Sequence, residues 1–297
     1  MQQATVKYPN FIVYLLPLAA VFIWSINIVL SRYAIDFISP ISISFYRWFI
    51  AWVLLTPFLI QPVLRNWLLI RPHLKQLAVL GLFGMVCYQG LAYTAAQYTS
   101  ATNMGIINAF IPVFSIFLSL FILSIRPTKQ AWLGVALSII GLVYLIGQGN
   151  IQQIFKSTHL FGDLLMIVAV GLYACYGVFL QKWQLKLALP LMLYMQITFA
   201  VIFHLPLLAY LGLEPLNLNN YIPVVYAALF PSIVAPFVWM LAIRYLGSNA
   251  SSLFLNFMPV FTAIIAYFFL QEQWTYYHTI GGILVLTGVL IAQKKVT

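Results

Sequence analysis

The sequence predicts an all-α integral membrane protein with ten transmembrane helices, arranged as two inverted five-helix repeats around a central cavity. Three observations predict this fold. The 297 residues are 64% hydrophobic and only 6% charged, whereas a soluble domain carries about 25% charged residues. Apolar runs of membrane-spanning length follow one another with short linkers between them. The second half of the chain also repeats features of the first half.

Ten apolar runs are long enough to cross a bilayer, whose hydrocarbon core of roughly 30 Å needs about 20 helical residues. The first run is too long for the core of a signal peptide, and no small-residue cleavage site follows it, so we expect it to remain as a span. The predicted spans cover 11–31, 42–62, 75–96, 101–124, 130–148, 162–182, 189–211, 221–244, 250–270 and 276–293.

Basic residues gather in alternate loops between these runs. Of the 14 Lys and Arg residues, Arg47 lies inside a run, and only Arg32 and Lys156 fall in loops opposite the termini. Cytoplasmic loops carry an excess of Lys and Arg, so both termini of this multi-pass chain are predicted on the cytoplasmic side of the cytoplasmic (inner) membrane. The net charge of +10 therefore indicates topology rather than nucleic-acid binding. All four acids fall at the opposite face: Asp36, Asp163, Glu214 and Glu272.

An internal repeat supports the count of ten. Residues 98–144 align with 245–291 without a gap, and Pro112 falls on Pro259. The matched glycines are Gly134 with Gly281 and Gly141 with Gly288. We expect the repeats to occupy 1–148 and 149–297. Because each contains an odd number of spans, the second enters the membrane upside down, an arrangement that places a solute site near the midplane between the halves.

Several motifs carry a family resemblance. They are Trp24-Ser-Ile-Asn27, Pro40 with Arg47, the Pro259 helix, Glu272-Gln-Trp-Thr275, and Gly281 with Gly288. In this order, duplicated over nearly the whole chain, they resemble the EamA-type branch of the drug/metabolite transporter superfamily. The first copy departs from the family pattern, because Ser124-Ile-Arg126 stands where members often have Glu before Pro-Thr. The resemblance implies ten helices around a central cavity and transport of metabolites, often outward, without implying a particular substrate.

Polar and aromatic residues inside the spans are candidates for the site. Trp24 and Asn27 lie three residues apart in the first span and share a helix face. Tyr173 and Tyr176 do the same in the sixth span, its counterpart in the repeat. Polar groups in a membrane helix are costly unless paired or hydrated, so we expect these faces to meet across the central cavity. The alternative is ordinary helix packing, with Asn27 bonded to a neighbouring backbone.

Pro112 and Pro259 lie inside the fourth and ninth spans, where each removes a backbone donor and frees a carbonyl. Asn108 and Asn256 lie beside the freed groups. Two interpretations stand equal. Either the kinks present carbonyl and amide groups to a solute, or the Asn side chains repair the lost hydrogen bonds.

Two residues are candidates for charge recognition or ion coupling. Arg47 can bind a substrate carboxylate through two hydrogen bonds, but an arginine near the interface more often extends to the surface or pairs with an acid such as Asp36, and that structural role is favoured. His204 can couple transport to protons or act as a hydrogen-bonded packing residue, which is favoured. Further candidate lining residues are Tyr88, Gln89, Tyr93, Gln196 and Trp239.

These features favour a secondary carrier, an exporter or facilitator of small organic metabolites such as amino acids, working by alternating access. A lining rich in Trp, Tyr and Asn suits a neutral or zwitterionic solute with an apolar or aromatic body. The alternative solute is a lipophilic cation or drug held by aromatic rings. The sequence has no Walker loop, so ATP is not expected to drive transport from within the chain. A rival class of protein is a membrane scaffold or an intramembrane enzyme, but the sequence has no paired catalytic acids, zinc motif or nucleophile motif.

The expected partners are therefore a small-molecule solute and the lipid bilayer. No cofactor, metal ion or nucleic acid is expected. The two cysteines, Cys87 and Cys175, lie in separate spans and have no metal-ligand spacing. A monomer is compatible with the sequence.

Overall fold

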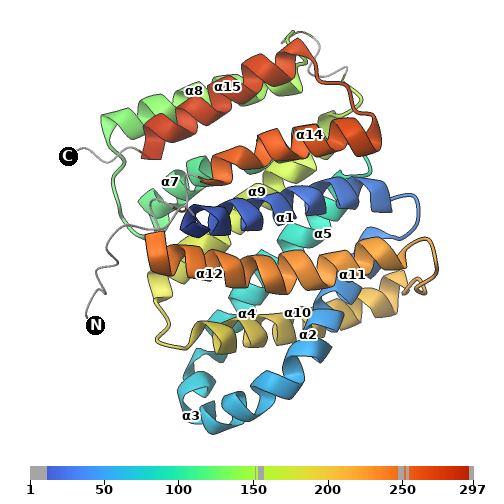
Figure 1. The fold of residues 1–297 in the computed structure, drawn as a ribbon. Coiled ribbons are helices and arrows are strands. Elements are labelled where there is room, and N and C mark those ends of the chain that lie inside the picture. The colour runs from blue at the N-terminus through green and yellow to red at the C-terminus, as the bar shows by residue number, and fades with distance from the viewer. Residues whose placement is uncertain (1–11, 151, 153–156, 247–250, 252–253, 294–297) are drawn as a thin grey trace.

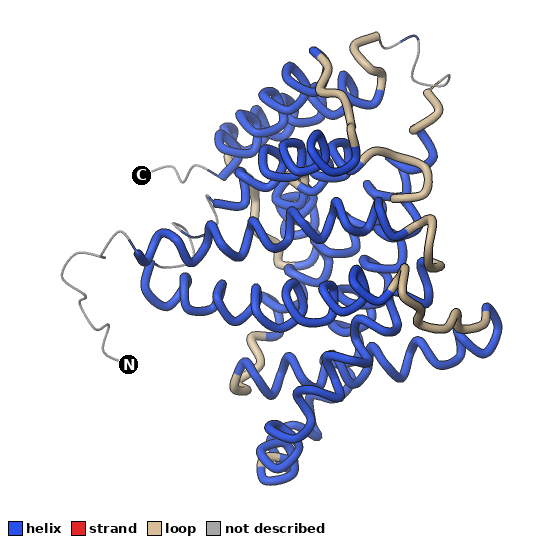
Figure 2. The backbone as a smooth tube through the Cα atoms, turned by 45° about the vertical axis from the view of Figure 1, so that its right-hand side comes forward, coloured by secondary structure: helices blue, strands red, loops and turns tan. Residues whose placement is uncertain are grey.

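The computed structural model describes residues 12–150, 152, 157–246, 251 and 254–293, and the regular structure within these residues is helical throughout. The helices run back and forth in a single bundle, with loops gathered at its two ends (Figure 1, Figure 2).

Some spans are single helices and others are broken. The uninterrupted helices are α1 (Ile12–Ala34), α2 (Pro40–Arg65), α8 (Lys129–Ile146), α9 (Leu160–Trp183), α10 (Leu189–Leu211) and α15 (Tyr276–Gln293). The third span consists of α3 (Trp67–Ile70), η1 (Arg71–His73), α4 (Leu74–Gly81), η2 (Leu82–Cys87) and α5 (Tyr88–Ala95). The remaining pieces are α6 (Ala101–Asn108) and α7 (Ile111–Ile122), then α11 (Tyr221–Leu229), η4 (Phe230–Val234) and α12 (Ala235–Leu246), and finally η5 (Phe254–Phe257) and α14 (Met258–Leu270).

Length and composition make this a multi-pass membrane protein. Eight helices in the described residues are long and apolar enough to cross a membrane. Two shorter apolar helices, Phe254–Leu270 and Tyr276–Ala292, coincide with the ninth and tenth predicted spans. The third helical segment begins earlier than the predicted residue 75, at Trp67. Helix continues there because Pro72 stands at the start of the η1 turn, where its missing N–H costs no hydrogen bond.

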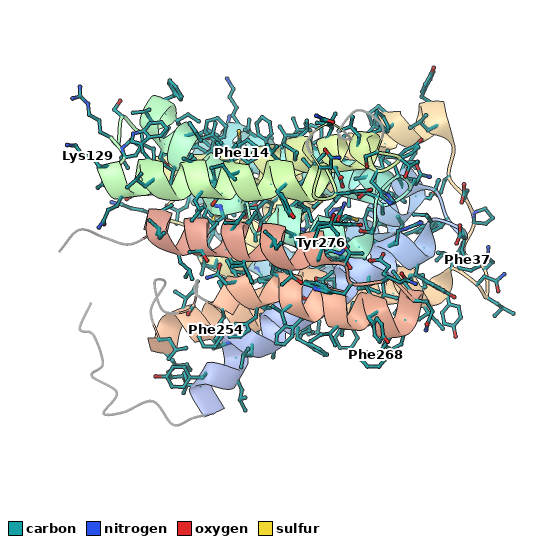
Figure 3. All side chains as sticks on the ribbon, turned by 90° about the horizontal axis from the view of Figure 1, so that it is seen from above. Phe37, Phe114, Lys129, Phe254, Phe268 and Tyr276 are labelled. Carbon is teal, nitrogen blue, oxygen red and sulfur yellow. The ribbon has the colours of Figure 1, made fainter. Side chains whose placement is uncertain are left out.

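The two ends of the bundle differ in charge. One end, here called the acidic end, holds the loops and helix termini that carry Asp36, Asp163, Glu214 and Glu272. The opposite end, here called the basic end, holds the start of α1 and the end of α15 (Figure 1). Figure 3 shows Lys129 at the basic end and Phe37 at the acidic end.

Two helical segments contain a π turn at corresponding places in the sequence repeat. If the offset that relates residues 98–144 to 245–291 is continued towards the N-terminus, η2 falls on η4 to within one residue. A π turn disturbs the regular hydrogen-bond ladder and is frequent at functional sites. In both turns a backbone carbonyl accepts from an indole of another helix: Met85 O from Trp48 Nε1 at 2.9 Å, and Pro231 O from Trp24 Nε1 at 3.2 Å. The turns therefore fix two large aromatic side chains.

Glycines let α8 and α15 approach each other closely. A Cβ atom on Gly134 would lie 2.4 Å from Ala292 N, and one on Gly288 would lie 2.5 Å from Gly134 O. Gly141 and Gly281 make a second contact of this kind. Small residues are the usual means of bringing membrane helices into backbone contact, and here they are the four glycines that the repeat matches.

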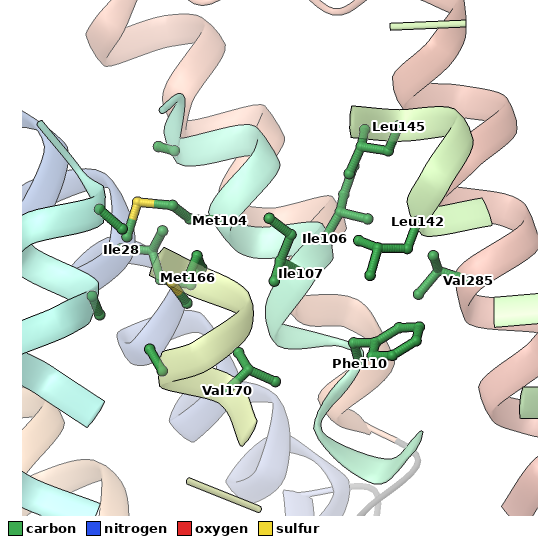
Figure 4. Close-up of a cluster of buried hydrophobic side chains, with 14 of the residues drawn as sticks. Ile28, Met104, Ile106, Ile107, Phe110, Leu142, Leu145, Met166, Val170 and Val285 are labelled. Carbon is green, nitrogen blue, oxygen red and sulfur yellow. The ribbon is translucent and has the colours of Figure 1, made fainter. Parts of the chain in front are cut away.

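Helices of the two sequence halves are interleaved. α1 packs against α12 and α14, whereas α9 packs against α5 and α7; likewise α2 packs against α11 and α10 against α4. The largest buried apolar cluster includes Ile107, Leu145, Met166 and Val285 (Figure 4). Lipid tails are as apolar as these side chains, so close packing rather than expulsion of water stabilises the cluster. Interleaving brings polar groups from both halves into the middle of the bundle.

Candidate functional site

A buried arginine is the centre of the candidate site. Only 3% of the surface of Arg47 is exposed. Its Nε donates to Ser232 Oγ at 2.7 Å, while Nη1 lies 3.5 Å from Asn27 Oδ1 and 3.4 Å from Tyr93 OH. The guanidinium also stands over the ring of Trp48, 4.8 Å from its centroid. Thus α1, α2, α5 and η4 each supply a group around one positive charge.

The protein partners of this charge are neutral. No Asp or Glu among the described residues pairs with Arg47, and Asp36 is exposed on the loop after α1. Nη2 of Arg47 has no hydrogen-bond partner within the described parts of the chain. A charged side chain at the centre of a membrane helix costs about 2.5–3.5 kcal/mol on insertion scales. Arg47 therefore points into the bundle, away from both the surface and Asp36, and its charge is incompletely satisfied.

Trp24 and Asn27 lie beside this arginine on α1. The rings of Trp24 and Trp239 have centroids 5.5 Å apart, and the indole of Trp24 is held by the η4 turn. Asn27 offers its side-chain oxygen to Arg47. The shared face of α1 that the sequence predicted is thus turned towards η4 and α12 on one side and α2 on the other.

Three tyrosines form a neighbouring ring cluster between α5 and α9. The Tyr173 centroid lies 4.7 Å from that of Tyr88 and 5.4 Å from that of Tyr176. Tyr88 OH donates to Asn108 Oδ1 at 3.0 Å. A Cβ atom on Gly84 would lie 2.7 Å from the Tyr176 ring, so glycine makes room for it in the η2 turn. All three rings lie deep inside the bundle, yet each keeps accessible surface.

The two groups are linked through the arginine. No hydrogen bond or ring contact among the described residues joins Trp24 or Asn27 to the Tyr173–Tyr176 pair. Arg47 is close enough to interact electrostatically with the phenol groups of Tyr88, Tyr173 and Tyr226. Tyr226 OH in turn donates to the Ile23 carbonyl of α1 at 3.0 Å.

The prolines break their spans instead of bending them. Pro112 lies in the first turn of α7, after α6 has ended at Asn108, and Pro259 lies in the first turn of α14 after η5. A first-turn proline lacks only a donor that would have no helical partner. The Asn108 side chain accepts from Tyr88, whereas Asn256 is half-buried and has no hydrogen-bond partner among the described residues.

The other candidates lie at helix contacts. His204 is fully buried, with Nδ1 2.7 Å from Ala200 O and Nε2 3.0 Å from Ser44 Oγ. The Nδ1 contact lies within α10, whereas the Nε2 contact joins α10 to α2, so both ring nitrogens have protein partners. Gln196 is buried on α10, and its Oε1 has no partner among the described residues. Gln89 is buried on α5.

A second polar cluster, at the acidic end, was not predicted. Asp163 of α9 is fully buried and accepts hydrogen bonds from Thr99 Oγ1 and, at 3.1 and 3.2 Å, from Asn103 Nδ2. Asn103 Oδ1 lies 3.2 Å from His278 Nε2, and His278 Nδ1 accepts from Thr275 N at 3.1 Å. In the sequence, the only indication of this cluster is that several predicted spans end with acidic or polar residues at the acidic end.

A carboxylate from the second half caps a helix of the first half. Glu272 accepts from Ala101 N at 2.7 Å and from Thr102 N and Oγ1 at 3.0 and 2.7 Å. It thereby satisfies free N–H groups at the start of α6. Beside it lies a pocket of about 470 Å³, whose lining includes Arg32, Glu272 and His278.

The sequence pattern did not indicate Ser232 or Tyr226 as site residues. A serine in an apolar span commonly bonds its own helix, as Ser232 Oγ does to Ala227 O at 2.7 Å. Nothing in the sequence distinguishes it from a packing residue. Within the described residues, no group of three or more His, Cys, Asp or Glu side chains is placed to hold a metal ion.

Comparison with known proteins identifies the family. The sequence model of the EamA-like transporter family matches residues 11–147 and again residues 160–293. The chain belongs to the EamA-like transporter family. Each half of this EamA-like transporter thus contains one copy of the family sequence, as the resemblance of its motifs implies.

Similar EamA-like chains come from bacteria and archaea. An uncharacterized transporter of Archaeoglobus fulgidus is 29% identical over 282 residues, covering 92% of this chain and 94% of the relative. The uncharacterized transporter YyaM of Bacillus subtilis is 29% identical over 273 residues, covering 89% and 87%. One crystal structure covers 96% of this chain and 97% of its own with a TM-score of 0.61 at 17% identity, which shows a shared fold.

Proposed function

We propose that this membrane transporter is a secondary carrier, an exporter or facilitator of small organic metabolites such as amino acids across the cytoplasmic membrane. Two five-helix units, residues 1–148 and 149–297, cross the membrane in opposite orientations and rock against each other by alternating access. The observation that carries the proposal is the convergence of both halves on one buried charge: Asn27 and Tyr93 on one side of Arg47, Ser232 on the other.

The packing of the helices supports the inverted repeat. Under the sequence alignment, α1 corresponds to α9, α5 to α12, and α7 to α14. The contacts of α1 with α12 and α14 then have counterparts in those of α9 with α5 and α7. The π turns η2 and η4 also agree with this correspondence. So does the contact of α8 with α15, in which glycines of each helix meet glycines at matching positions of the other. A two-fold relation with the solute site at the repeat interface is a common construction of secondary transporters.

The orientation follows from the charged ends. Lys and Arg dominate the basic end, so we place it, with both termini, in the cytoplasm. Reporter fusions near Lys7 and Lys295, which lie outside the described residues, are expected to report the cytoplasm in both cases. Readings from opposite sides of the membrane would require an odd number of spans and would exclude the inverted repeat.

A central cavity is supported by the exposure of the tyrosine cluster. Tyr88, Tyr173 and Tyr176 are surrounded by protein and still keep accessible surface. We take the accessible parts of these rings to border the proposed cavity, where aromatic faces suit the apolar body of a solute. The rival solute, a lipophilic cation, is disfavoured because Arg47 repels it and no acid stands in this cluster to offset that charge.

Transport in proteoliposomes tests the proposal. The purified protein is first screened for thermal stabilisation by the standard L-amino acids, and uptake of the stabilising ones, isotopically labelled, is then measured. We expect uptake to exceed that of protein-free liposomes and to saturate. Absence of uptake for every stabilising compound, in vesicles shown to contain inserted protein, would contradict carrier function.

A further inference from the structure

Arg47 is a buried cation whose partners in the described chain are all uncharged. We infer that Arg47 binds a carboxylate of the transported solute, so the carrier selects metabolites that bear a carboxylate. This inference rests on the proposed carrier function and names its substrate class. It goes beyond the aromatic character of the lining, which by itself suits neutral, zwitterionic and cationic solutes.

The hydrogen bonds of Arg47 leave one edge of the guanidinium available. Nε is engaged by Ser232 at 2.7 Å. Nη1 makes only long contacts, at 3.5 Å to Asn27 and 3.4 Å to Tyr93, and Nη2 makes none to the described residues. Hydrogen bonds at these lengths are weak, whereas a carboxylate binds a guanidinium through two parallel bonds of about 2.7–2.9 Å. The Nη1–Nη2 edge therefore has the donors that such a ligand needs.

The surroundings of Arg47 favour a ligand role over a structural one. A structural arginine in a membrane protein is normally paired with an acid or reaches the interface. Arg47 does neither, although its Nε bond to Ser232 and its contact with the Trp48 ring hold it in a defined position. A fixed charge without a counter-ion costs stability, and a ligand that supplies the opposite charge offsets that cost. The nearby rings of Tyr88 and Tyr173 would contact the rest of the solute.

Pairs of ligands that differ only at the carboxyl group provide the test. Binding to purified protein is measured for each standard L-amino acid that stabilises it and for the matching carboxamide, in which a neutral amide replaces the carboxylate. We expect the wild-type protein to bind the amino acid about tenfold more tightly or better. Arg47→Gln is expected to abolish that preference. Arg65→Gln, which removes the same charge from the exposed end of α2, is the matched control and should keep it.

Arg47→Lys keeps the test decisive if Arg47→Gln fails to fold. Lysine retains the charge but loses the planar fork that binds both carboxylate oxygens. The expected result is several-fold weaker binding of the amino acid and unchanged binding of the carboxamide. Equal binding of both compounds by the wild-type protein would overturn the inference, as would an equal loss for both in Arg47→Lys.

The transport assay separates this inference from the proposed function. If the protein took up carboxamides and amino acids equally well, the carrier function would be supported and the proposed role of Arg47 would be refuted. Absence of uptake for every compound, in vesicles with inserted protein, would refute the carrier function itself and this inference with it.

Discussion

The two buried polar clusters differ in how fully the protein satisfies their charges. At the acidic end, Asp163 receives hydrogen bonds from Thr99 and Asn103 and lies in the first turn of α9, where the helix dipole favours a negative charge. In the centre, Arg47 has one short hydrogen bond and two long ones. The Asp163 carboxylate is surrounded by hydrogen-bond donors, whereas the Arg47 guanidinium keeps donors without a partner among the described residues.

This difference separates structural polar groups from binding groups. A buried charge with a complete set of partners fixes the segments that supply them. Here these are α9, α6 and the turn before α6, which come from both halves of the chain. A buried charge with an incomplete set costs stability and gains from a ligand. Substitutions at the acidic end should therefore change stability, and substitutions in the centre should change solute affinity.

Asp163→Ala is expected to have the largest effect. It leaves the buried donors of Thr99 and Asn103 without an acceptor, and each unsatisfied group costs about 1–3 kcal/mol. We expect a loss of about 3 kcal/mol in the stability of the purified protein, measured by thermal or denaturant unfolding in detergent. Asp36→Ala removes an exposed acid at the same end and should be nearly neutral. A folded Asp163→Ala protein with normal stability and lost affinity would reverse the roles of the two clusters.

Glu272→Ala should destabilise less. The carboxylate caps α6 through two backbone N–H groups and one hydroxyl, and loss of a helix cap costs about 0.5–2 kcal/mol. The neighbouring Gln273 is exposed, so Gln273→Ala is the control. Unfolding midpoints of the two variants give the comparison. Equal midpoints would show that the capping contact contributes nothing to stability.

The sequence predicted the apolar helices of a multi-pass membrane protein from local features of the chain. Span length, loop charge and the repeat of Pro112 and Pro259 depend only on residue type and spacing. Breaks and π turns depend on neighbouring helices. Trp24 and Trp48 bond to backbone carbonyls of η4 and η2, and such contacts between distant segments have no local sequence signal.

The sequence indicated some residues of the candidate site but not the contacts that they make. Arg47 and Asn27 stood out as polar residues in apolar runs, but their helical spacing does not tell which helices they meet. Pairing of Arg47 with Asp36 was reasonable from their separation along the chain. The structure instead turns Arg47 towards Ser232, which comes from the other half of the sequence.

Trp24→Ala and Asn27→Ala test the centre of the molecule. Trp24 offers ring area next to Trp239, and Asn27 offers an acceptor next to Arg47. Loss of one hydrogen bond costs about 1 kcal/mol, so Asn27→Ala should weaken solute binding several-fold, and Trp24→Ala more because stacking area is lost too. Binding is measured on purified, monodisperse protein. Wild-type affinity together with reduced stability would make both residues packing groups.

Tyr176→Phe is expected to have the smallest effect and separates ring from hydroxyl. The Tyr176 hydroxyl has no hydrogen-bond partner among the described residues, whereas the Tyr88 hydroxyl donates to Asn108 at 3.0 Å. Removal of the Tyr176 hydroxyl should therefore leave stability unchanged, because no protein contact is lost, and should weaken binding by about 1 kcal/mol or less if the solute takes that hydrogen bond. Tyr88→Phe is the matched control, since it leaves the buried Asn108 oxygen unpaired and should lower stability. If the two variants had equal stability and unchanged solute affinity, the tyrosine cluster would not be part of the binding site. The site would then consist of Arg47 and its neighbours.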